Sequence, residues 1–372
     1  MRVLQLGKFY PVRGGVEKVM WDIASGLCSE GFSCDMLCAD ADSSLKEVKE
    51  IVFDGPGKCF VVPALGKFAA TMISPKMVSW LGKHKDEYDV IHVHHPDPMA
   101  CLALKLSGYK GKVVLHWHSD ILKQKFFLKL YKPLQNWLIR RAGRIVCTSP
   151  VYAEGSEALG NVQGKVTVVP IGVEPVKADE EGAAMIRSRF EGKKIVYSLG
   201  RLVGYKGYRY LVEAASRLSD DYVVVIGGEG PLREELEEQI AALGLQEKVK
   251  LIGRVSDNDF EAWYGACDLF CLSSVWKTEA FAIVQIEAMS CGRPVVATRI
   301  PGSGVSWVNA DGISGLNVPV EDPAALASAI MEVCSQKHAQ LCEGALDRYT
   351  STFTSEAMLD RCKAMYERIL QQ

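Results

Sequence analysis

The chain has 372 residues, of which 48% are hydrophobic and 24% charged, a composition typical of a globular protein long enough for two domains. No stretch reaches about 18 uninterrupted apolar residues and the opening apolar run is short, so we expect neither a membrane span nor a secretion signal. The net charge of -2 hides a basic first half, because residues 1–176 carry 22 Lys and Arg against 17 Asp and Glu. Such an excess favours an anionic surface or ligand beside that half.

Twelve cysteines are scattered along the chain without a CxxC pair. Cys34 and Cys38, like Cys267 and Cys271, are four residues apart within apolar runs, where buried thiols are more common than a disulfide scaffold. We therefore predict free thiols and a cytoplasmic location.

Short apolar runs alternate with amphipathic stretches of helix length, which predicts parallel sheets flanked by helices. In the first half the runs are residues 2–7, 33–39, 89–95, 112–118, 144–149 and 165–172. After a polar stretch the alternation restarts, with runs at 194–200, 222–228, 249–254, 269–274, 293–299 and 314–319.

We predict an α/β fold of two Rossmann-like doubly wound domains, residues 1–174 and 175–372, joined near 172–180. The last stretch, about 353–372, reads as a terminal helix pair that can pack back on the first domain. Ligands of such sheets bind beyond the carboxyl ends of the strands, so a central cleft between the two domains is the expected site.

Two carboxylates, Glu279 and Glu287, lie eight residues apart among apolar and small residues. Buried acids are costly unless a polar group meets them. On a helix, eight residues span roughly 12 Å, whereas the carboxyls of a glycosidase are about 5–9.5 Å apart. The spacing therefore favours one long ligand with two hydroxyl-rich ends, such as a nucleotide sugar, with a helix start between them near the phosphates.

The stretch around these acids, CDLFCLSSVWKTEAFAIVQIEAMSCGRPVVAT at 267–298, resembles the signature of retaining GT-B glycosyltransferases of family four. The resemblance extends over nearly the whole chain. Its further motifs are GGVE at 14–17, HSD at 118–120, VVPIGVE at 168–174, GRLVGYKG at 200–207, GGEGPL at 227–232 and DGISGLNVP at 311–319.

The resemblance implies that Glu279 binds hydroxyls of the donor sugar and that Glu287 holds the ribose. Residues between them are expected to complete the donor pocket, namely Ala280, Phe281, Ala282 and Ile283. The family usually has Glu-x-Phe-Gly, where the glycine lets the backbone approach the donor. Ala282 stands at that position here and adds a methyl group that could tighten the pocket.

Arg201 and Lys206 follow the strand run 194–200 and are separated by a glycine-containing turn, so both can converge on one anion. An arginine fork matches phosphate oxygens, and a lysine supplies a point charge. By resemblance they neutralise the departing diphosphate, the task that a metal performs elsewhere. Solvated surface cations are the alternative interpretation.

Glycines open two strand-to-helix turns. Gly14 and Gly15 precede a helix-length stretch and would let backbone approach a phosphate or sugar. Gly228 lies in GGEGPL, which in the family is near the nucleoside. The dinucleotide fingerprint GxGxxG is absent from the first turn, which disfavours an NAD-dependent oxidoreductase.

Histidines cluster at His92, His94, His95, His116 and His118. Alternate histidines on a strand could ligate zinc, but no accompanying Cys or Glu motif supports a metal, and we expect none. His118 matches the family histidine that meets the donor sugar near the breaking bond, in orientation and charge stabilisation. Asp120 and His94 are acceptor-side candidates; Asp120 could instead support His118.

Residues 121–144 hold seven basic residues and no acid, with Leu122, Phe126, Leu130, Leu134 and Trp137 at helical spacing. Pro133 interrupts the pattern and suggests two short helical pieces. Two interpretations remain open: a core-facing helix with a solvated basic back, or a face that lies on anionic lipid at the inner side of a membrane.

The sequence thus predicts a metal-independent, cofactor-free hexosyltransferase that moves a sugar from a nucleotide diphosphate to a hydroxyl of a glycan or lipid-linked acceptor. The HSD motif followed by ILKQK looks most like bacterial mannosyl- and related transferases of surface polysaccharide assembly, which favours GDP-mannose over a UDP-sugar. A sugar-nucleotide epimerase of the same architecture and a non-catalytic nucleotide-binding protein are the alternatives. No nucleic acid is expected as a partner.

Overall fold

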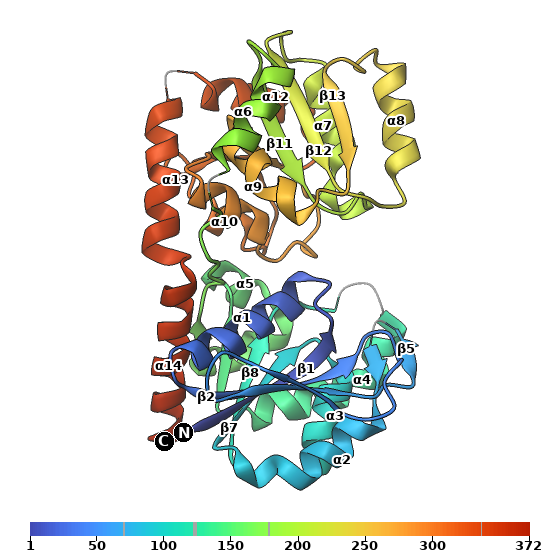
Figure 1. The fold of residues 1–372 in the computed structure, drawn as a ribbon, viewed down its shortest axis with the longest axis vertical. Coiled ribbons are helices and arrows are strands. Elements are labelled where there is room, and N and C mark those ends of the chain that lie inside the picture. The colour runs from blue at the N-terminus through green and yellow to red at the C-terminus, as the bar shows by residue number, and fades with distance from the viewer. Residues whose placement is uncertain (70, 122–124, 178, 336) are drawn as a thin grey trace. The chain divides into compact units, whose positions relative to one another are not determined.

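The computed structural model describes residues 1–69, 71–121, 125–177, 179–335 and 337–372, without the side chains of 125–128 and 257–258. It consists of two compact units (Figure 1). Unit 1 comprises Met1–Ile171 together with Ser355–Gln372, and unit 2 comprises Gly172–Thr354. The C-terminal segment therefore belongs with the N-terminal part of the chain.

Unit 1 is built on a twisted sheet with the strand order β10-β9-β8-β7-β1-β2-β4-β3, parallel throughout except where β3 pairs with β4. A small antiparallel hairpin, β5–β6, stands apart from it. The strands are β1 (Arg2–Tyr10), β2 (Ser33–Asp40), β3 (Lys49–Val52), β4 (Lys58–Val62), β5 (Gly66–Phe68), β6 (Thr71–Ile73), β7 (Val90–His95), β8 (Lys112–Trp117), β9 (Arg144–Cys147) and β10 (Val166–Val168). The winding reverses between β1 and β7, and this is the switch point where ligands of such sheets bind.

Helices cover both faces of this sheet (Figure 1). The helices of unit 1 are α1 (Gly15–Ser29), α2 (Pro75–His84), α3 (Pro98–Ser107), α4 (Lys125–Arg141), α5 (Pro150–Gly155) and α14 (Ser355–Leu370), with 3-10 turns η1 (Lys85–Glu87) and η2 (Glu157–Lys165). Three of them start on the same local pattern, in which a Ser or Asp caps the helix and proline occupies its first turn: Ser74, Asp97 and Ser149 each accept a hydrogen bond from a backbone N–H of α2, α3 and α5.

Unit 2 has a fully parallel sheet in the order β13-β12-β11-β14-β15-β16, the doubly wound order 3-2-1-4-5-6. Its strands are β11 (Lys194–Leu199), β12 (Tyr222–Gly227), β13 (Val249–Gly253), β14 (Leu269–Leu272), β15 (Val295–Arg299) and β16 (Gly315–Pro319). Its helices are α6 (Glu180–Arg189), η3 (Gly204–Lys206), α7 (Tyr208–Ala215), α8 (Arg233–Ala242), α9 (Asp257–Ala266), α10 (Ile283–Ser290), α11 (Val305–Val308), α12 (Pro323–Val333) and α13 (His338–Thr352). The switch point lies between β11 and β14.

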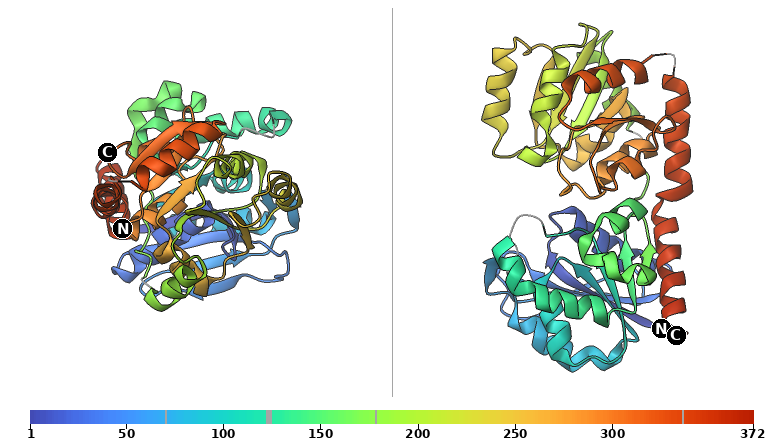
Figure 2. Two further views of the ribbon diagram at one scale, coloured as in Figure 1. Left: turned by 90° about the horizontal axis from the view of Figure 1, so that it is seen from above. Right: turned by 180° about the vertical axis from the view of Figure 1, so that it is seen from behind.

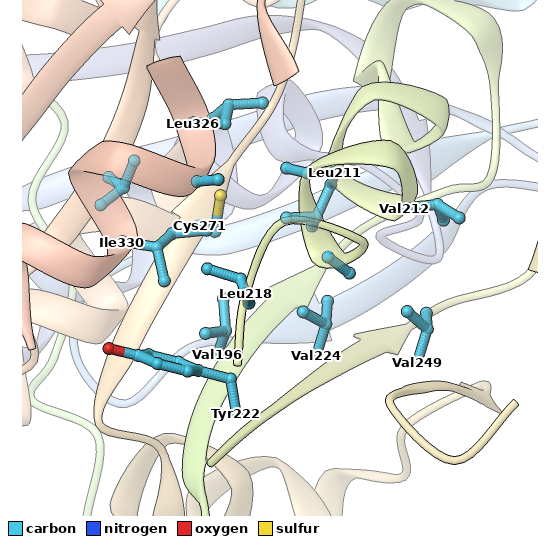
Figure 3. Packing of buried hydrophobic residues seen from close by; sticks show 14 of the residues in the cluster. Val196, Leu211, Val212, Leu218, Tyr222, Val224, Val249, Cys271, Leu326 and Ile330 are labelled. Carbon is cyan, nitrogen blue, oxygen red and sulfur yellow. The ribbon is translucent and has the colours of Figure 1, made fainter. Parts of the chain in front are cut away.

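The core of unit 2 forms where one face of the sheet meets α7 and α12 (Figure 3). Val196, Val224 and Cys271 contribute from three neighbouring strands, and Leu211 and Ile330 pack on them from the helices. Because both faces of a parallel sheet are covered, its strands are apolar without alternation.

All twelve strands expected from the sequence are present. The expected α/β class, with two parallel sheets, is confirmed. The short β4 was missed because its five residues begin with a lysine and give too brief an apolar run. All twelve cysteines are free thiols.

Two helical expectations were wrong. The terminal stretch forms one helix, α14, which a break in the red ribbon separates from α13 (Figures 1 and 2). Pro133 lies inside the single helix α4 and does not divide it. Helix α14 packs along α1, where Gly26 leaves room for Leu359.

Candidate active site

The ends of β11 and β14 in unit 2 bring a buried ion pair together. Lys206 ends the turn η3 after β11, and its Nζ lies 2.6 Å from Oε2 of Glu279, which follows β14. Ser274 Oγ donates to the same carboxylate oxygen at 2.9 Å. Both charged residues are 8% exposed. Burial, the largest single effect, lowers the pKa of Lys206, but the Glu279 carboxylate together with Tyr208 and Tyr205 outweighs burial, so that the pKa is raised. The pair is therefore a cation and an anion held at the switch point.

Helix α10 begins at Ile283, four residues after Glu279, and Ala282 is the N-cap residue that precedes it. Ala282 has φ 63° and ψ 81°, a left-handed conformation that favours glycine. The glycine usual in the family thus fits a backbone requirement here, and the alanine is strained. Glu287 is the fifth residue of α10, about one turn inside the helix, and Tyr264 donates to its Oε2 at 2.9 Å.

Residues between the two acids differ in how deeply they are buried. The Phe281 ring is 4% exposed and makes an edge contact with Phe353, so it faces the core of unit 2. The carbonyl oxygen of Ala280 accepts from the backbone N–H of Gly304 at 2.9 Å. Ala280 and Ile283 are half-buried. Phe281 therefore shapes the loop from behind and does not offer its ring to a ligand.

Glycines bring two loops of unit 2 into backbone contact. Gly228 has φ 135°, and a Cβ there would lie 1.9 Å from the carbonyl oxygen of Gly200. Gly207 has φ 65°, and a Cβ there would meet the carbonyl oxygen of Ser273 at 2.2 Å. Only glycine allows this close approach. Arg201, on the loop between these contacts, has an exposed side chain, whereas Lys206 is fixed.

In unit 1 the carboxyl ends of β7 and β8 place His118 beside His94. His118 is 5% exposed, and its Nε2 lies 2.9 Å from Nδ1 of His94. Burial lowers the pKa of both histidines well below the ordinary value, so both are neutral at pH 7. His94 has no exposed surface, so it lies behind His118 and is not placed to touch an acceptor directly, contrary to the expectation.

Three histidines, His92, His94 and His116, offer nitrogen atoms within 4.8 Å of one another, a spacing that could hold a metal ion. Their rings, however, stack with interplanar angles of 13° to 29°. Lone pairs in nearly parallel rings point side by side and do not converge on one centre. Both nitrogens of His94 are also hydrogen-bonded, to His118 and Gln5. The arrangement resembles a buried polar network more than a metal site.

Asp120 lies just after β8, and the glycines Gly14 and Gly15 lie at the start of α1, both in unit 1. The Asp120 Oδ1 accepts from Trp117 Nε1 at 2.9 Å and from Ser156 Oγ at 2.6 Å, which ties the end of β8 to α5 and η2. Gly14 caps α1, and a Cβ there would lie 2.7 Å from a carboxylate oxygen of Glu17. Gly15 is the exposed first residue of α1.

The sequence analysis did not identify four residues of these clusters. Two of them could have been found, because each is a polar side chain in an otherwise apolar run: Gln5 in β1 and Ser274 just after β14. Lys8, in β1 with φ 61°, adds a cation that further lowers the pKa of His118, which burial lowers most. Tyr366 carried no signal, because it lies 361 residues from its partner Gln5.

A pocket of about 490 Å³ in unit 2 lies elsewhere, between α6 and α9, where Asp179, Arg189 and Trp263 contribute to its lining. None of the candidate residues lines it. It is therefore not part of this site.

Comparison with known proteins covers both units. Residues 13–177 match the family described as Glycosyltransferase Family 4, and residues 184–345 match Glycosyl transferases group 1. The chain is 31% identical over 377 residues to O-antigen chain mannosyltransferase C of Escherichia coli, covering 100% of this chain and 99% of the relative. It is also 31% identical to D-rhamnosyltransferase WbpZ of Pseudomonas aeruginosa, over 95% of this chain and 93% of the relative.

Solved structures agree on the fold. The structure of Anabaena Alr3699/HepE in complex with UDP matches with a TM-score of 0.79 at 21% identity, over 99% of this chain and 100% of the other. The two-sheet architecture is thus that of GT-B glycosyltransferases. With an unbroken match along both units, this chain belongs to the family 4, group 1 glycosyltransferases and uses a nucleotide sugar as donor.

Proposed function

We propose that the protein transfers a hexose, with retention of configuration, from a nucleotide diphosphate sugar to a hydroxyl of a glycan or lipid-linked acceptor in surface polysaccharide synthesis. The buried Lys206–Glu279 pair at the switch point of unit 2 carries this proposal, because it sets a fixed cation beside a sugar-binding acid. The relatives named as an O-antigen chain mannosyltransferase and a rhamnosyltransferase support the pathway and favour GDP-mannose, with a UDP-sugar next.

The diphosphate is bound by Arg201 and Lys206, and no metal is needed because two cations neutralise the leaving group. Lys206 is held in place by Glu279, whereas Arg201 is exposed and free to close on the ligand. A carboxylate has about four acceptor positions, so Glu279 can bind Lys206, Ser274 and sugar hydroxyls together. Glu287, held by Tyr264, binds the ribose.

The acceptor hydroxyl attacks the anomeric carbon on the face from which the diphosphate departs. The C–O bond to the phosphate breaks through an oxocarbenium-like state as the new C–O bond forms, and a donor phosphate oxygen takes the hydroxyl proton. His118 orients the sugar in this step. These assignments follow the family resemblance and fit the neutral state of His118.

Replacing the exposed cation tests the transferase assignment. Arg201→Ala should lower kcat by about 100- to 1,000-fold, as expected for loss of one group that stabilises developing negative charge, and leave the melting temperature unchanged. Transfer is measured with a panel of nucleotide sugars and lipid-linked glycan acceptors. Arg209→Ala, an exposed arginine of α7, is the matched control. Equal turnover of the two variants would contradict the role of Arg201.

Nucleotide specificity is tested by thermal shift with GDP, UDP, ADP and dTDP. A ligand that binds the native state raises its melting temperature by mass action. GDP should give the largest rise; no rise with any of the four would contradict nucleotide binding.

The face of unit 1 around α3, α4 and the β5–β6 hairpin fits an anionic lipid surface. Residues 65–76, 98–110 and 121–144 carry eleven Lys and Arg and no acid. An open pocket of about 310 Å³ there is lined by apolar side chains that include Phe68, Leu102 and Leu130. Leu130 is 71% exposed and Phe68 60% exposed, so α4 is not simply core-facing. Leu122 and the side chain of Phe126 lie outside the described residues.

Exposed apolar side chains on segments rich in lysine and arginine are the pattern of a surface that rests on anionic lipid. Among the described residues, no helix has the length and apolar character to cross a bilayer. Attachment of this face to the membrane would therefore be peripheral.

Co-sedimentation with vesicles tests this attachment. Binding to phosphatidylglycerol vesicles should exceed binding to phosphatidylcholine vesicles, and Lys129→Glu with Lys132→Glu should abolish the difference. Lys46→Glu with Lys49→Glu, exposed positions at the β3 edge of the same unit, is the control and should keep it. Binding that ignores lipid charge would contradict the proposal.

A further inference from the structure

A continuous chain of buried hydrogen bonds runs from His118 into the interior of unit 1. His118 Nε2 lies 2.9 Å from His94 Nδ1, and His94 Nε2 lies 2.9 Å from Gln5 Oε1. Gln5 Nε2 donates to the Tyr366 hydroxyl at 3.0 Å, and this hydroxyl lies 2.6 Å from His92 Nδ1. These hydrogen bonds thus connect the loop after β8 with β7, β1 and α14.

We infer that Gln5, His94 and Tyr366 are positioning residues that fix His118 as the Nε2–H tautomer, so that its Nδ1 is the unprotonated nitrogen available to a ligand hydroxyl. The inference rests on the proposed function only for the identity of that ligand. The direction of the hydrogen bonds follows from the side-chain amide of Gln5. Its carbonyl oxygen can only accept a hydrogen bond, and its NH₂ group can only donate.

The carbonyl end of Gln5 faces His94, so the proton of neutral His94 sits on Nε2 and its Nδ1 must accept. His118, facing that Nδ1, must then donate from Nε2. The two rings are nearly coplanar, with an interplanar angle of 18°, so that the N–H of one ring lies in line with the lone pair of the other. Neutral His118 has a single N–H, and its Nδ1 is left bare.

The other end of Gln5 agrees with this direction. Its amide Nε2 lies 3.5 Å from Cys34 Sγ and donates to it. Tyr366 accepts from the same nitrogen and donates its proton to His92. The network ends at His92, whose other ring nitrogen, Nε2, has no hydrogen-bond partner among the described residues.

A bare Nδ1 decides what His118 can bind. It accepts a hydrogen bond from a sugar O–H, and its lone pair is favourable beside a carbon that gains positive charge. It repels a bare oxyanion, so a phosphate oxygen is not its partner. The substrate group at this position is thus a hydroxyl donor.

Long-range proton–nitrogen NMR of protein labelled with nitrogen-15 histidine measures the tautomer directly, without substrate and without activity. The His118 signals, identified by their loss in His118→Ala, should show a protonated Nε2 and an unprotonated Nδ1 at pH 7.5. Gln5→Leu should convert His118 to a mixture of tautomers. Gln5→Glu, which keeps an acceptor toward His94, should retain the Nε2–H form.

Tyr366→Phe should weaken the preference of His118 for the Nε2–H tautomer, whereas Tyr109→Phe should not. Tyr109 is also buried in unit 1, but its hydroxyl donates to the carbonyl oxygen of Tyr88, which is not part of this hydrogen-bond network. A protonated Nδ1 in the native protein, or a tautomer unchanged by Gln5→Leu, would overturn the inference. Failure of sugar transfer with the tautomer as stated would instead count against the proposed function alone.

Discussion

At the scale of single residues, Lys206 and Glu279 depend on each other. Each charge would be costly in its buried position without the other, because desolvation of a lone ion outweighs most local contacts. The sequence showed both residue types and the strand ends that carry them, but not that they contact one another, since 73 positions of chain separate them.

Removing one partner should therefore destabilise more than removing both. Lys206→Met is expected to lower the free energy of unfolding by about 3–5 kcal/mol, and the double change Lys206→Met with Glu279→Leu by clearly less. Urea denaturation of the single and double variants gives the coupling energy. Losses that simply add would contradict a buried pair.

Ala282 is the second residue-scale case. Replacing it by glycine removes the strain of a positive φ, which costs about 1–2 kcal/mol in an L-residue, but adds freedom to the unfolded chain worth about 0.4–1 kcal/mol. Ala282→Gly should thus raise the free energy of unfolding by up to about 1.5 kcal/mol.

The control for this change is Ala184→Gly, an exposed position inside α6. There glycine should cost about 1 kcal/mol relative to alanine. Equal losses at both positions, measured by urea denaturation, would show that Ala282 is not strained.

At the scale of elements, the apolar runs predicted all the strands of unit 2 and six strands of unit 1, but they did not predict which surface each helix packs against. Helix α14 has an amphipathic pattern that any sheet or helix could cover. The packing of α14 on α1 depends on Gly26 and on the contact between Tyr366 and Gln5. Neither contact can be predicted from the local sequence pattern of the helix. The same limit explains α4, where the helical spacing of Leu130 left a core-facing and a lipid-facing position open, and the structure exposes the side chain.

The attachment of α14 is testable through its apolar face. Leu359→Ala should lower the stability of unit 1 by about 2–5 kcal/mol, because Leu359 is 5% exposed and its loss leaves a cavity against α1. Glu367→Ala, at an exposed position of the same helix, should stay within about 0.5 kcal/mol. Amide exchange of α1 reports the change; equal effects of both variants would contradict the packing.

At the scale of the whole molecule, the two units differ in their histidines. Unit 1 buries His92, His94, His95, His116 and His118, and burial lowers the pKa of each, to about 3 for His95 and His116. Unit 2 contains His338 alone. The units should therefore respond differently to acid.

The sign follows from proton binding. Below about pH 6.5 the histidines of the unfolded protein become protonated, whereas the buried histidines of the folded protein stay neutral. The free energy of unfolding is therefore highest above that pH, and it falls as the pH drops toward the pKa values of the folded state. Each histidine contributes up to about 1.4 kcal/mol per pH unit. Between pH 7 and 5, amide exchange should speed up in β7 and β8 before β11 and β12; the reverse order would contradict the account.

The central claim is that a nucleotide diphosphate binds unit 2 at the switch point beside Lys206 and Glu279. Amide exchange measured by mass spectrometry, with and without GDP or UDP, tests it most directly. The account predicts slower exchange in the loops at residues 200–207, 228–232 and 275–284, and loss of this protection in Arg201→Ala. Protection confined to the pocket between α6 and α9, with those loops unchanged, would contradict it.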